Sequence, residues 1–381
     1  MMTKFVIYLD HGATSWPKPN GVLCGIAAFM AGVAGNAGRS GHYAAVESAR
    51  LVYQVREQLA RILKIPDPAD MVFTHGTTEG LNLVLKGFLR EGDHILVSPM
   101  EHNSLMRPLK RLCRERNVTF SILLADKYGR VDIEQARKNR PKSPVRLIGI
   151  SHASNVNGVV QDLSGLRAAF PDTPILVDAA QSAGVLPIDV VKDGIDFVAF
   201  SGHKGLLGPT GTGGCYIDPR HDVAPLVEGG TGSKSESIEQ PDFRPDRYEA
   251  GTINLHGLAG LQGALEHIEE NGLGGDHKRR LATMLIEGIR DIPRVKLYSP
   301  TDGSALMAAF TIEGMHTDQV AQALENEFSI LCRAGMHCSP SAHQHLGTMP
   351  EGAVRLAPGY GNKDKEIEIA LRAVTKIAGR I

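Results

Sequence analysis

The sequence lacks the features of a membrane-spanning, exported or polyanion-binding protein. No apolar run approaches the roughly 20 residues that cross a bilayer, and the N-terminal apolar stretch, which ends at Asp10, is too short for a secretion signal. The five cysteines are odd in number and scattered, which argues against a disulfide scaffold and favours a reducing compartment. With 41 basic and 42 acidic residues the net charge is −1, so nothing attracts the chain to nucleic acid or an anionic membrane. We therefore expect a cytoplasmic protein that binds neither.

What is present is the composition of a folded protein with more than one core. Hydrophobic residues make up 42% of the chain and charged residues 22%, which is typical of globular domains. A length of 381 residues exceeds one ordinary domain, so two are expected. Short apolar strands alternate with helical runs between about residues 71 and 204, which predicts an α/β fold with a mostly parallel sheet. From about residue 256 the pattern is richer in helix and indicates a smaller C-terminal domain.

A lysine and an aspartate stand at the ends of two apolar strands. The run 197–200 leads directly into Ser201-Gly202-His203-Lys204, and the run 175–177 ends at Asp178. Ligands of parallel sheets bind beyond the carboxyl ends of the strands. Pyridoxal phosphate requires a lysine for its Schiff base and a carboxylate against its pyridine nitrogen. The pair predicts this cofactor; the alternative is a surface lysine and a helix-capping aspartate.

Other polar residues follow neighbouring strands or begin the next helix. Gly76-Thr77-Thr78 precedes a helical run, whose first N–H groups would suit a phosphate, although an ordinary threonine cap explains the pattern equally well. His102 follows a strand and is placed to stack on a planar ring, or to serve a structural role. Asn155 and Gln181 are placed to donate hydrogen bonds to a ring hydroxyl oxygen; for Asn155, helix capping is the alternative.

A second group of reactive residues lies near the C-terminus. Cys338 follows Arg333-Ala334-Gly335-Met336-His337, and Arg355 comes shortly after. A cysteine in such a loop suits a nucleophile, because the thiolate is the reactive form, and two arginines suit a substrate carboxylate. A buried structural cysteine is the alternative. A metal site is a further alternative whose spacing fits none of the usual zinc patterns, and its candidate ligands are Cys332, Cys338, His343 and His345.

The order of these motifs resembles that of the class V aminotransferase-fold enzymes, and most closely the Suf-type (group II) cysteine desulfurases and selenocysteine lyases. The Arg-x-Gly-x-His-Cys stretch at 333–338 carries the similarity to that branch, and the ordered set covers nearly the whole chain. The other matching segments are Tyr8-Leu9-Asp10, Gly76-Thr77-Thr78-Glu79-Gly80, Glu101-His102-Asn103, Ser154-Asn155-Val156-Asn157-Gly158, Asp178-Ala179-Ala180-Gln181, Ser201-Gly202-His203-Lys204, Gly208-Pro209-Thr210-Gly211 and Glu249-Ala250-Gly251-Thr252.

The resemblance implies the fold type I architecture of PLP-dependent transferases, with a seven-stranded type of sheet. A large PLP-binding domain would span 15–255, and residues 1–14 and 256–381 would form a small α+β domain with the cysteine loop. Lys204 would hold the cofactor covalently and Asp178 would pair with its ring nitrogen. The residues implied to address the ring are His102, Asn155 and Gln181. Those implied to bind the phosphate are Thr77, Thr78, Ser201, His203 and, from a partner subunit, Thr252, so a homodimer is implied.

The resemblance also implies the reaction. Arg355, with Arg333, would bind the substrate carboxylate, and the loop 36–42, beginning at Asn36, would line the entrance. Lys204 would move the Cα proton of L-cysteine, and the Cys338 thiolate would take the sulfur as a persulfide and release alanine. A protein acceptor would then receive the sulfur, in iron–sulfur cluster assembly or another branch of sulfur metabolism.

Departures from the family pattern leave alternatives for the substrate and acceptor. Ser339-Pro340-Ser341-Ala342-His343 after the cysteine and Leu356-Ala357-Pro358-Gly359 after Arg355 are unusual, and Tyr8-Leu9-Asp10 lies almost at the start. A selenocysteine lyase, or a class V enzyme for another amino acid, is therefore the alternative activity. A nucleotide-binding module is disfavoured because the phosphate-loop and dinucleotide fingerprints are missing. An inactive scaffold is disfavoured because Lys204, Asp178 and Cys338 occur together.

Overall fold

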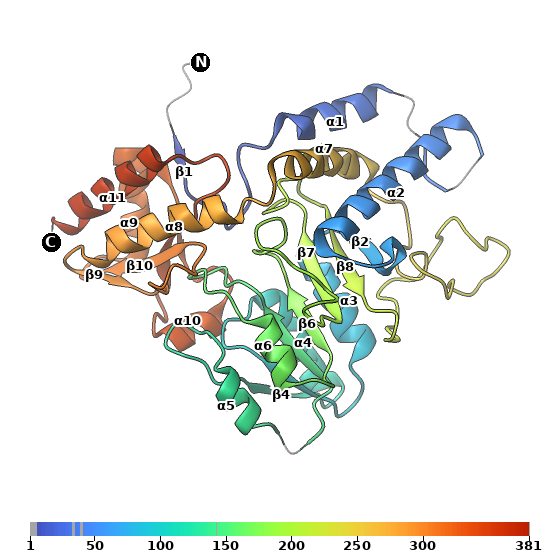
Figure 1. Cartoon of the computed structure of the whole chain (residues 1–381), viewed down its shortest axis with the longest axis horizontal. Coiled ribbons are helices and arrows are strands. Elements are labelled where there is room, and N and C mark those ends of the chain that lie inside the picture. The colour runs from blue at the N-terminus through green and yellow to red at the C-terminus, as the bar shows by residue number, and fades with distance from the viewer. Residues whose placement is uncertain (1–5, 33–34, 39–40, 142, 381) are drawn as a thin grey trace.

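The chain folds around a seven-stranded sheet in which one strand runs against the others. The computed structural model describes residues 6–32, 35–38, 41–141 and 143–380, and Figure 1 shows their arrangement. Only β8 is antiparallel to its neighbours; the remaining strands are parallel. This confirms the predicted α/β class with a mostly parallel sheet. The strands, in spatial order, are β2 (Met71–Thr74), β8 (Gly213–Ile217), β7 (Phe197–Ser201), β6 (Ile175–Asp178), β5 (Leu147–Ser151), β3 (His94–Val97) and β4 (Thr119–Ile122).

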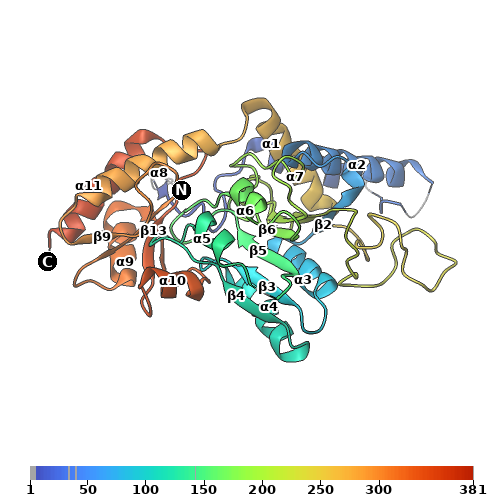
Figure 2. The same cartoon turned by 60° about the horizontal axis from the view of Figure 1, so that its bottom comes forward.

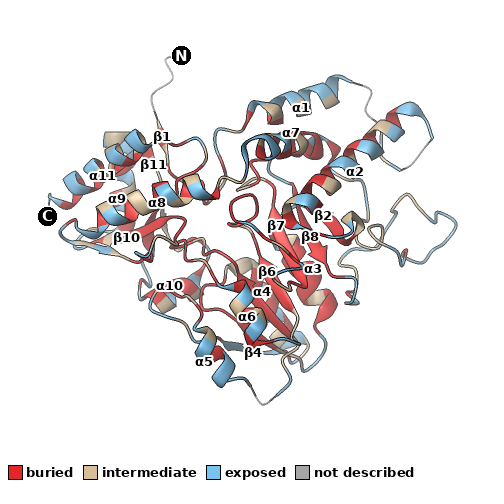
Figure 3. Cartoon of the chain, viewed as in Figure 1, coloured by how far each residue is buried: buried red, intermediate tan, exposed pale blue. Residues whose placement is uncertain are grey.

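Both faces of this sheet are covered by helices, because alternate residues of its strands point to opposite sides. In β6, Ile175 and Val177 join the apolar cluster of one face, and Leu176 joins the cluster of the other. Figure 3 shows the central strands as buried and the outward faces of the helices as exposed. The helices contributing to the first cluster include α2 (Tyr43–Leu63), α6 (Leu163–Ala169) and α7 (Leu255–Asn271), with α1 (Asn20–Ala31) packed on α7. Those on the second face are α3 (Thr77–Phe88) and α4 (Asn103–Glu115).

A second group of elements surrounds a smaller antiparallel sheet. Its core joins the two ends of the chain, because Ile7 and Leu9 pack in the same cluster as residues of the last helix. Figure 2 shows this group beside the large sheet. Its four-stranded sheet has the order β12 (Arg333–Gly335), β13 (Ala353–Leu356), β10 (Ala308–Ile312) and β9 (Val295–Leu297), and a parallel pair joins β1 (Ile7–Tyr8) to β11 (Ile330–Leu331). The helices contributing to its core are α8 (Gly275–Arg290), α9 (Thr317–Phe328) and α11 (Asp364–Ala378).

We propose that these two groups are the two predicted domains, with one adjustment. The predicted boundary at 255/256 falls at the start of α7. That helix packs against α1 and α2, and its Leu261 and Leu265 belong to the core of the large sheet. The proposed boundary therefore lies after α7 rather than before it.

The remaining elements are short. They are a 3-10 turn at Pro68–Asp70, α5 (Ile133–Lys138) and α10 (Pro340–Leu346). No helix among the described residues is long and apolar enough to cross a membrane.

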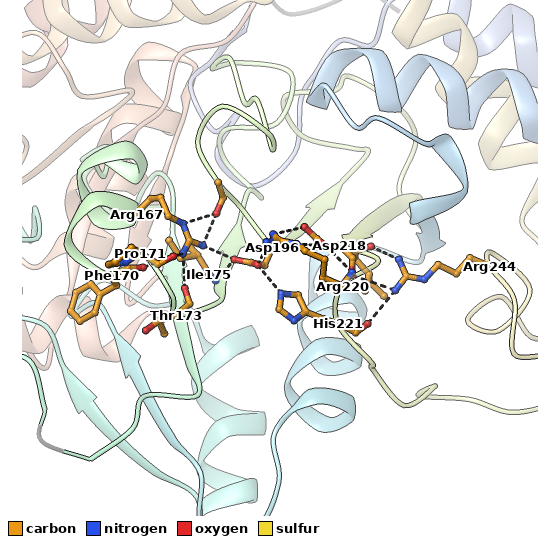
Figure 4. Close-up of polar contacts among 12 residues, drawn as sticks. Arg167, Phe170, Pro171, Thr173, Ile175, Asp196, Asp218, Arg220, His221 and Arg244 are labelled. Carbon is orange, nitrogen blue, oxygen red and sulfur yellow. Dashed lines mark hydrogen bonds and ion pairs between the residues drawn. The ribbon is translucent and has the colours of Figure 1, made fainter.

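Paired charges hold together the amino ends of the central strands. Asp196, directly before β7, accepts hydrogen bonds from Arg167 Nη2 at 2.6 Å and from the backbone N–H of Ile175 at 2.9 Å. His221 Nε2 lies 2.7 Å from the other carboxylate oxygen, and Arg220 Nη2 lies 3.3 Å from it. Figure 4 shows these contacts linking β6, β7 and the segment after β8. Because Asp196 is almost fully buried, this network satisfies a charge that would otherwise be costly.

Candidate active site

At the opposite, carboxyl ends of the same strands the structure forms a polar cavity of about 130 Å³. It contains every residue predicted to bind the cofactor from within one chain. The lining residues are Thr77, Thr78, His102, Ser104, Ser151, Ala153, Asn155, Asp178, Ala180, Gln181, Ser201, His203 and Lys204. Segments that follow five strands of the sheet, β2, β7, β6, β5 and β3, thus meet at one place, as the topology of a parallel sheet favours.

Lys204 and Asp178 provide the two charges of the cavity. Burial lowers the pKa of Lys204, and Asp178 opposes that change. Burial likewise raises the pKa of Asp178, against a hydrogen bond from the Ala180 N–H, at 2.9 Å, and the charge of Lys204. Among the described residues Lys204 makes no side-chain hydrogen bond or ion pair. Both groups therefore keep bonding capacity directed at the cavity.

One end of the cavity has the character of an anion site. Helix α3 begins after Gly76, which has no side chain to cap it, and the N-terminal turn of a helix favours an anion. The Thr77 N–H donates to Ser201 Oγ at 3.0 Å, and the hydroxyl of Thr78 pairs with Ser104 Oγ at 2.7 Å. A Cβ on Gly213 would lie 2.6 Å from Gly76 Cα. Small residues therefore let the two backbones approach closely at this end.

Two histidines line the cavity in their neutral form. Burial, followed by the charge of Lys204, lowers the pKa of His102 to about 4 and that of His203 to about 4. His102 Nδ1 also accepts the Ser104 N–H at 3.0 Å and so caps α4. Its capping and cavity-lining positions are thus compatible, although the sequence presented the two as alternatives. The side chain of His203 is held by Thr14, with Nδ1 at 3.1 Å from Oγ1.

The amides of Gln181 and Asn155 already have partners. Gln181 Nε2 donates to the Gly12 carbonyl at 2.8 Å. Asn155 Nδ2 donates to the His337 carbonyl at 2.7 Å, and its Oδ1 accepts from Ser339 Oγ at 2.7 Å. Asn155 therefore connects the cavity to the loop that carries Cys338. Its predicted contact with a ring hydroxyl stays a prediction.

The Cys338 loop is held at the rim of this cavity. His337 and Cys338 adopt φ values of 47° and 57°, a left-handed region that non-glycine residues seldom occupy. The Cys338 carbonyl accepts the Asn103 N–H at 2.9 Å, next to His102. Clamped by Asn103 and Asn155, the loop presents an exposed Cys338 side chain.

The other cysteines differ from Cys338 in environment. Cys215 is buried in the sheet, where burial raises its pKa. Burial, followed by the charge of Asp10, raises the pKa of Cys332 to about 12. Cys24 is exposed on α1 and Cys113 is partly buried on α4, and neither lines the Lys204 cavity. Cys338 alone joins exposure to a place beside that cavity.

Two arginines lie near the lysine and the cysteine loop. Arg355, only 1% exposed, bonds Asp10 Oδ1 at 2.5 Å and the Asn155 carbonyl at 2.7 Å, and its buried Nε has no partner. The Arg333 guanidinium makes no hydrogen bond or ion pair within the described ranges. Its charge lowers the pKa of both Lys204 and His102. Both groups retain N–H donors suited to a carboxylate.

The described residues contain no group of three or more histidine, cysteine and acidic side chains able to hold a metal. His343 instead contacts His337, with 3.3 Å between Nε2 and Nδ1, and Thr348 Oγ1 at 2.7 Å. His345 Nε2 bonds the Asp126 carbonyl at 2.7 Å. Two of the four candidate ligands therefore have other partners.

Like Arg333, Cys338 and Arg355, the predicted residues Thr252 and Asn36 are not among those that line the cavity of a single chain. Thr252 lies in a separate pocket of about 200 Å³ with Gly211 and Glu249. Asn36 is exposed between α1 and α2 and is not among the lining residues. Arg39 and Ser40 of the same loop lie outside the described residues.

The sequence pattern did not assign two further residues that support the site. Glu101 is fully buried, and burial raises its pKa to about 7. It accepts from the Ser151 N–H at 2.9 Å and from Ser98 Oγ at 2.5 Å, and so ties two strand ends together. Asp10 bonds Arg355. Both stand in the quoted motifs Glu101-His102-Asn103 and Tyr8-Leu9-Asp10, which was the available signal.

Comparison with known proteins agrees with this geometry. The sequence pattern of the family described as "Aminotransferase class-V" matches residues 7–369. The chain belongs to the class V aminotransferase family. This family depends on pyridoxal phosphate. The match extends over both sheets, so the cavity and the cysteine loop lie within it.

Class V relatives match nearly the full chain. A probable cysteine desulfurase from Methanothermobacter thermautotrophicus is 33% identical, over 98% of this chain and 95% of its own length. The apo structure of a cysteine desulfurase from Thermococcus onnurineus superposes with a TM-score of 0.91 at 31% identity, covering 99% of this chain and 95% of that one. A cysteine desulfurase from Escherichia coli gives a TM-score of 0.87 at 29% identity, over 98% and 95%.

Proposed function

We propose that this chain is a PLP-dependent cysteine desulfurase of the Suf type, which converts L-cysteine to L-alanine and keeps the sulfur as a persulfide on Cys338. The observation that carries the proposal is the attachment of an exposed cysteine loop to the rim of the Lys204 cavity, through Asn155 and Asn103. Near relatives named as cysteine desulfurases support it.

The cavity residues fit pyridoxal phosphate. Lys204 would supply the amine for covalent attachment, and Asp178 would supply the carboxylate for the ring nitrogen. The uncapped start of α3, with Thr78 and Ser201, offers N–H and O–H donors to the phosphate. His102 and His203 line the same cavity, and His102 would lie against the ring. When bound, the cofactor supplies an electron sink that stabilises negative charge at the substrate Cα.

The chain's own groups perform the remaining tasks. Arg333 and Arg355 Nε are free to bind the substrate carboxylate and so orient the amino acid. Burial lowers the pKa of Lys204, which favours the neutral amine that would move the Cα proton. The Cys338 thiolate attacks the substrate sulfur: an S–S bond forms, the Cβ–S bond breaks, and Cβ takes a proton to give alanine.

The finer parts of the proposal concern partners and location. Thr252 is proposed to reach the phosphate of a second subunit, which makes the enzyme a homodimer, and its place outside the single-chain cavity is consistent with this. The exposed position of Cys338 suits transfer of the persulfide to an acceptor protein, in iron–sulfur cluster assembly or a related branch of sulfur metabolism. The cytoplasmic location rests on the free, scattered cysteines.

Single-turnover mass spectrometry tests the role of Cys338. Holoenzyme is mixed with one equivalent of L-cysteine, and we expect an added sulfur on the peptide that contains Cys338, with alanine released in equal amount. Cys338→Ala should bind cysteine, seen as a change in cofactor absorbance, yet lose at least about 10³-fold in alanine formation. Cys24→Ala is the matched control, because Cys24 is also exposed, and it should behave as wild type.

The result that would contradict the proposal is an added sulfur on another cysteine, or a Cys338→Ala variant as fast as wild type. Parallel assays with L-selenocysteine separate the alternative activity. A selenocysteine lyase would turn over selenocysteine and leave cysteine unreacted even with Cys338 in place.

A further inference from the structure

A second cavity is lined by Lys204 but by no other residue of the proposed cofactor site. Its volume is about 330 Å³, at the lower end of the range for small-molecule sites. Residues of the connection from α7 to α8 line it, and Figure 1 shows that connection. Lys204 lines both cavities, while Asp178, His102 and the α3 N-terminus line only the first. The two cavities are thus separate spaces with one shared wall residue.

Lys278 gives this second cavity an uncompensated positive charge. It lies in α8, is only 6% exposed and lines the cavity. Within the ranges that the structure describes, its ammonium has no hydrogen bond and no ion pair. An unpaired buried charge is costly and needs a counter-charge. The fold itself provides none, since no aspartate or glutamate is among the residues that line the cavity.

The charged and titratable neighbours of Lys278 reinforce this deficit. Lys204 and Arg355 repel its charge and, after burial, contribute to lowering its pKa to about 8. At neutral pH the group remains mostly protonated. Burial lowers the pKa of His11 to about 3, so it is neutral, and His277 Nε2 is paired with the Asn362 carbonyl at 3.0 Å. None of these groups can serve as the counter-ion.

We propose that this cavity binds a small organic carboxylate, with its carboxylate on Lys278 and its carbon skeleton against the apolar part of the wall. The first turn of α8 lines the same end and adds N–H groups that favour an anion. Val185, Leu207 and Ile268 supply apolar surface, which a compact inorganic ion would not use. Because Lys204 is the shared wall, the occupant contacts the reactive lysine and acts on the proposed cofactor site without entering it.

Calorimetry on the PLP-loaded enzyme tests the proposal at constant ionic strength. The probes are acetate, succinate, citrate and benzoate, with inorganic phosphate as the non-organic reference. We expect at least one organic acid to bind at one site per chain, more tightly than phosphate, and to shift the cofactor absorbance without turnover. Lys278→Met removes the charge at similar volume and should weaken binding at least tenfold. The matched control is Lys365→Met on α11, which loses an exposed charge and should bind as wild type.

Three results would overturn the proposal. The first is no binding by any of the four acids. The second is an unchanged affinity in Lys278→Met, which would place the acid on Arg333 and Arg355 instead. The third is phosphate binding as tightly as every organic acid, which would indicate general attraction of anions to positive charge. Retention of cofactor absorbance by Lys278→Met shows that the variant is folded. The outcome is independent of desulfurase activity, because binding is the readout.

Discussion

The charged side chains at the two ends of strands β6 and β7 differ in whether they have partners. At the amino ends, Asp196 is surrounded by Arg167, Arg220 and His221, and its carboxylate is fully engaged. At the carboxyl ends, Asp178 is as deeply buried and Lys204 is half-buried, yet Lys204 has no side-chain partner among the described residues. The charged groups at the amino ends of these strands thus stabilise the fold, whereas those at the carboxyl ends remain able to bind a ligand. Substitutions at the two ends should therefore separate activity from stability.

Lys204→Ala should have the largest effect and should act on chemistry alone. With no amine to hold the cofactor or move the Cα proton, we expect alanine formation to fall by at least about 10⁴-fold, about 5.5 kcal/mol of transition-state stabilisation. The melting temperature of the cofactor-free protein should not fall, because a buried unpaired charge has been removed. Borohydride trapping should fix the cofactor to the wild-type Lys204 peptide and fail in the variant. A variant that unfolds would give Lys204 a structural role instead.

Asp178→Asn should have the next largest effect on turnover, again without loss of stability. A neutral amide cannot hold the cofactor ring nitrogen protonated, so we expect a loss of about 10²–10³-fold in turnover, comparable to removal of one electrostatic stabiliser. Burial raises the pKa of Asp178 in the folded chain, so its charge is a cost to folding, and the variant should be as stable as wild type in urea. Near-normal turnover would show that the carboxylate is structural.

Asp196→Asn is the counterpart at the other end. Removing this buried charge leaves Arg167 and His221 without their partner, and we expect the free energy of unfolding to fall by about 3–4 kcal/mol. Turnover of the folded fraction should be unchanged. Asp222→Asn is the matched control, since Asp222 also pairs with an arginine but is 72% exposed, and it should change stability by less than about 1 kcal/mol. If Asp196→Asn lost turnover but not stability, Asp196 would not have the purely structural role that distinguishes the amino ends of the strands from the carboxyl ends.

Substitution of Lys278 should have a smaller effect on the free energy of unfolding, and that effect should depend on pH. The pKa of Lys278 is lowered from 10.5 to about 8 in the folded chain by burial and by Arg355 and Lys204. Below pH 8 both states carry the charge and folding bears its full cost. Between about pH 8 and 10.5 the unfolded state binds more protons, so this group makes stability rise with pH. Lys278→Met should be more stable than wild type at pH 7, by on the order of 2–3 kcal/mol. Urea unfolding should show that advantage shrinking toward pH 10; an advantage that grows with pH would be the wrong sign.

The sequence predicted one end of the sheet better than the rest, for physical reasons. Lys204 and Asp178 were found because apolar strands with a polar residue at their end are a local pattern, and parallel topology brings such ends together. The attachment of Asn155 to the 337–339 loop was not predictable, since it joins residues far apart in the chain through side-chain orientation alone.

Lys278 was missed for a related reason. It stands in the run His277-Lys278-Arg279-Arg280, which has the composition of a solvated helix face. In the folded chain it is nevertheless only 6% exposed. The place of α7 on the large sheet was missed similarly, because helical periodicity shows which side of a helix is apolar but not which core receives it.

The pairing of β1 with β11 determines when Arg355, the arginine proposed to bind the substrate, gains its counter-ion Asp10 during synthesis. Ile7 of β1 pairs with Ile330 of β11. Shortly after β1, Asp10 forms a backbone bridge with Ala357, and its side chain bonds Arg355. All strands of the large sheet emerge from the ribosome before β11 does, so that sheet can form while the N-terminal strand still lacks its neighbour. A nascent chain can therefore assemble the proposed cofactor pocket before it can hold an amino acid. The chain can carry out the proposed reaction only after the C-terminal segment with Arg355 has packed against the N-terminal segment with Asp10.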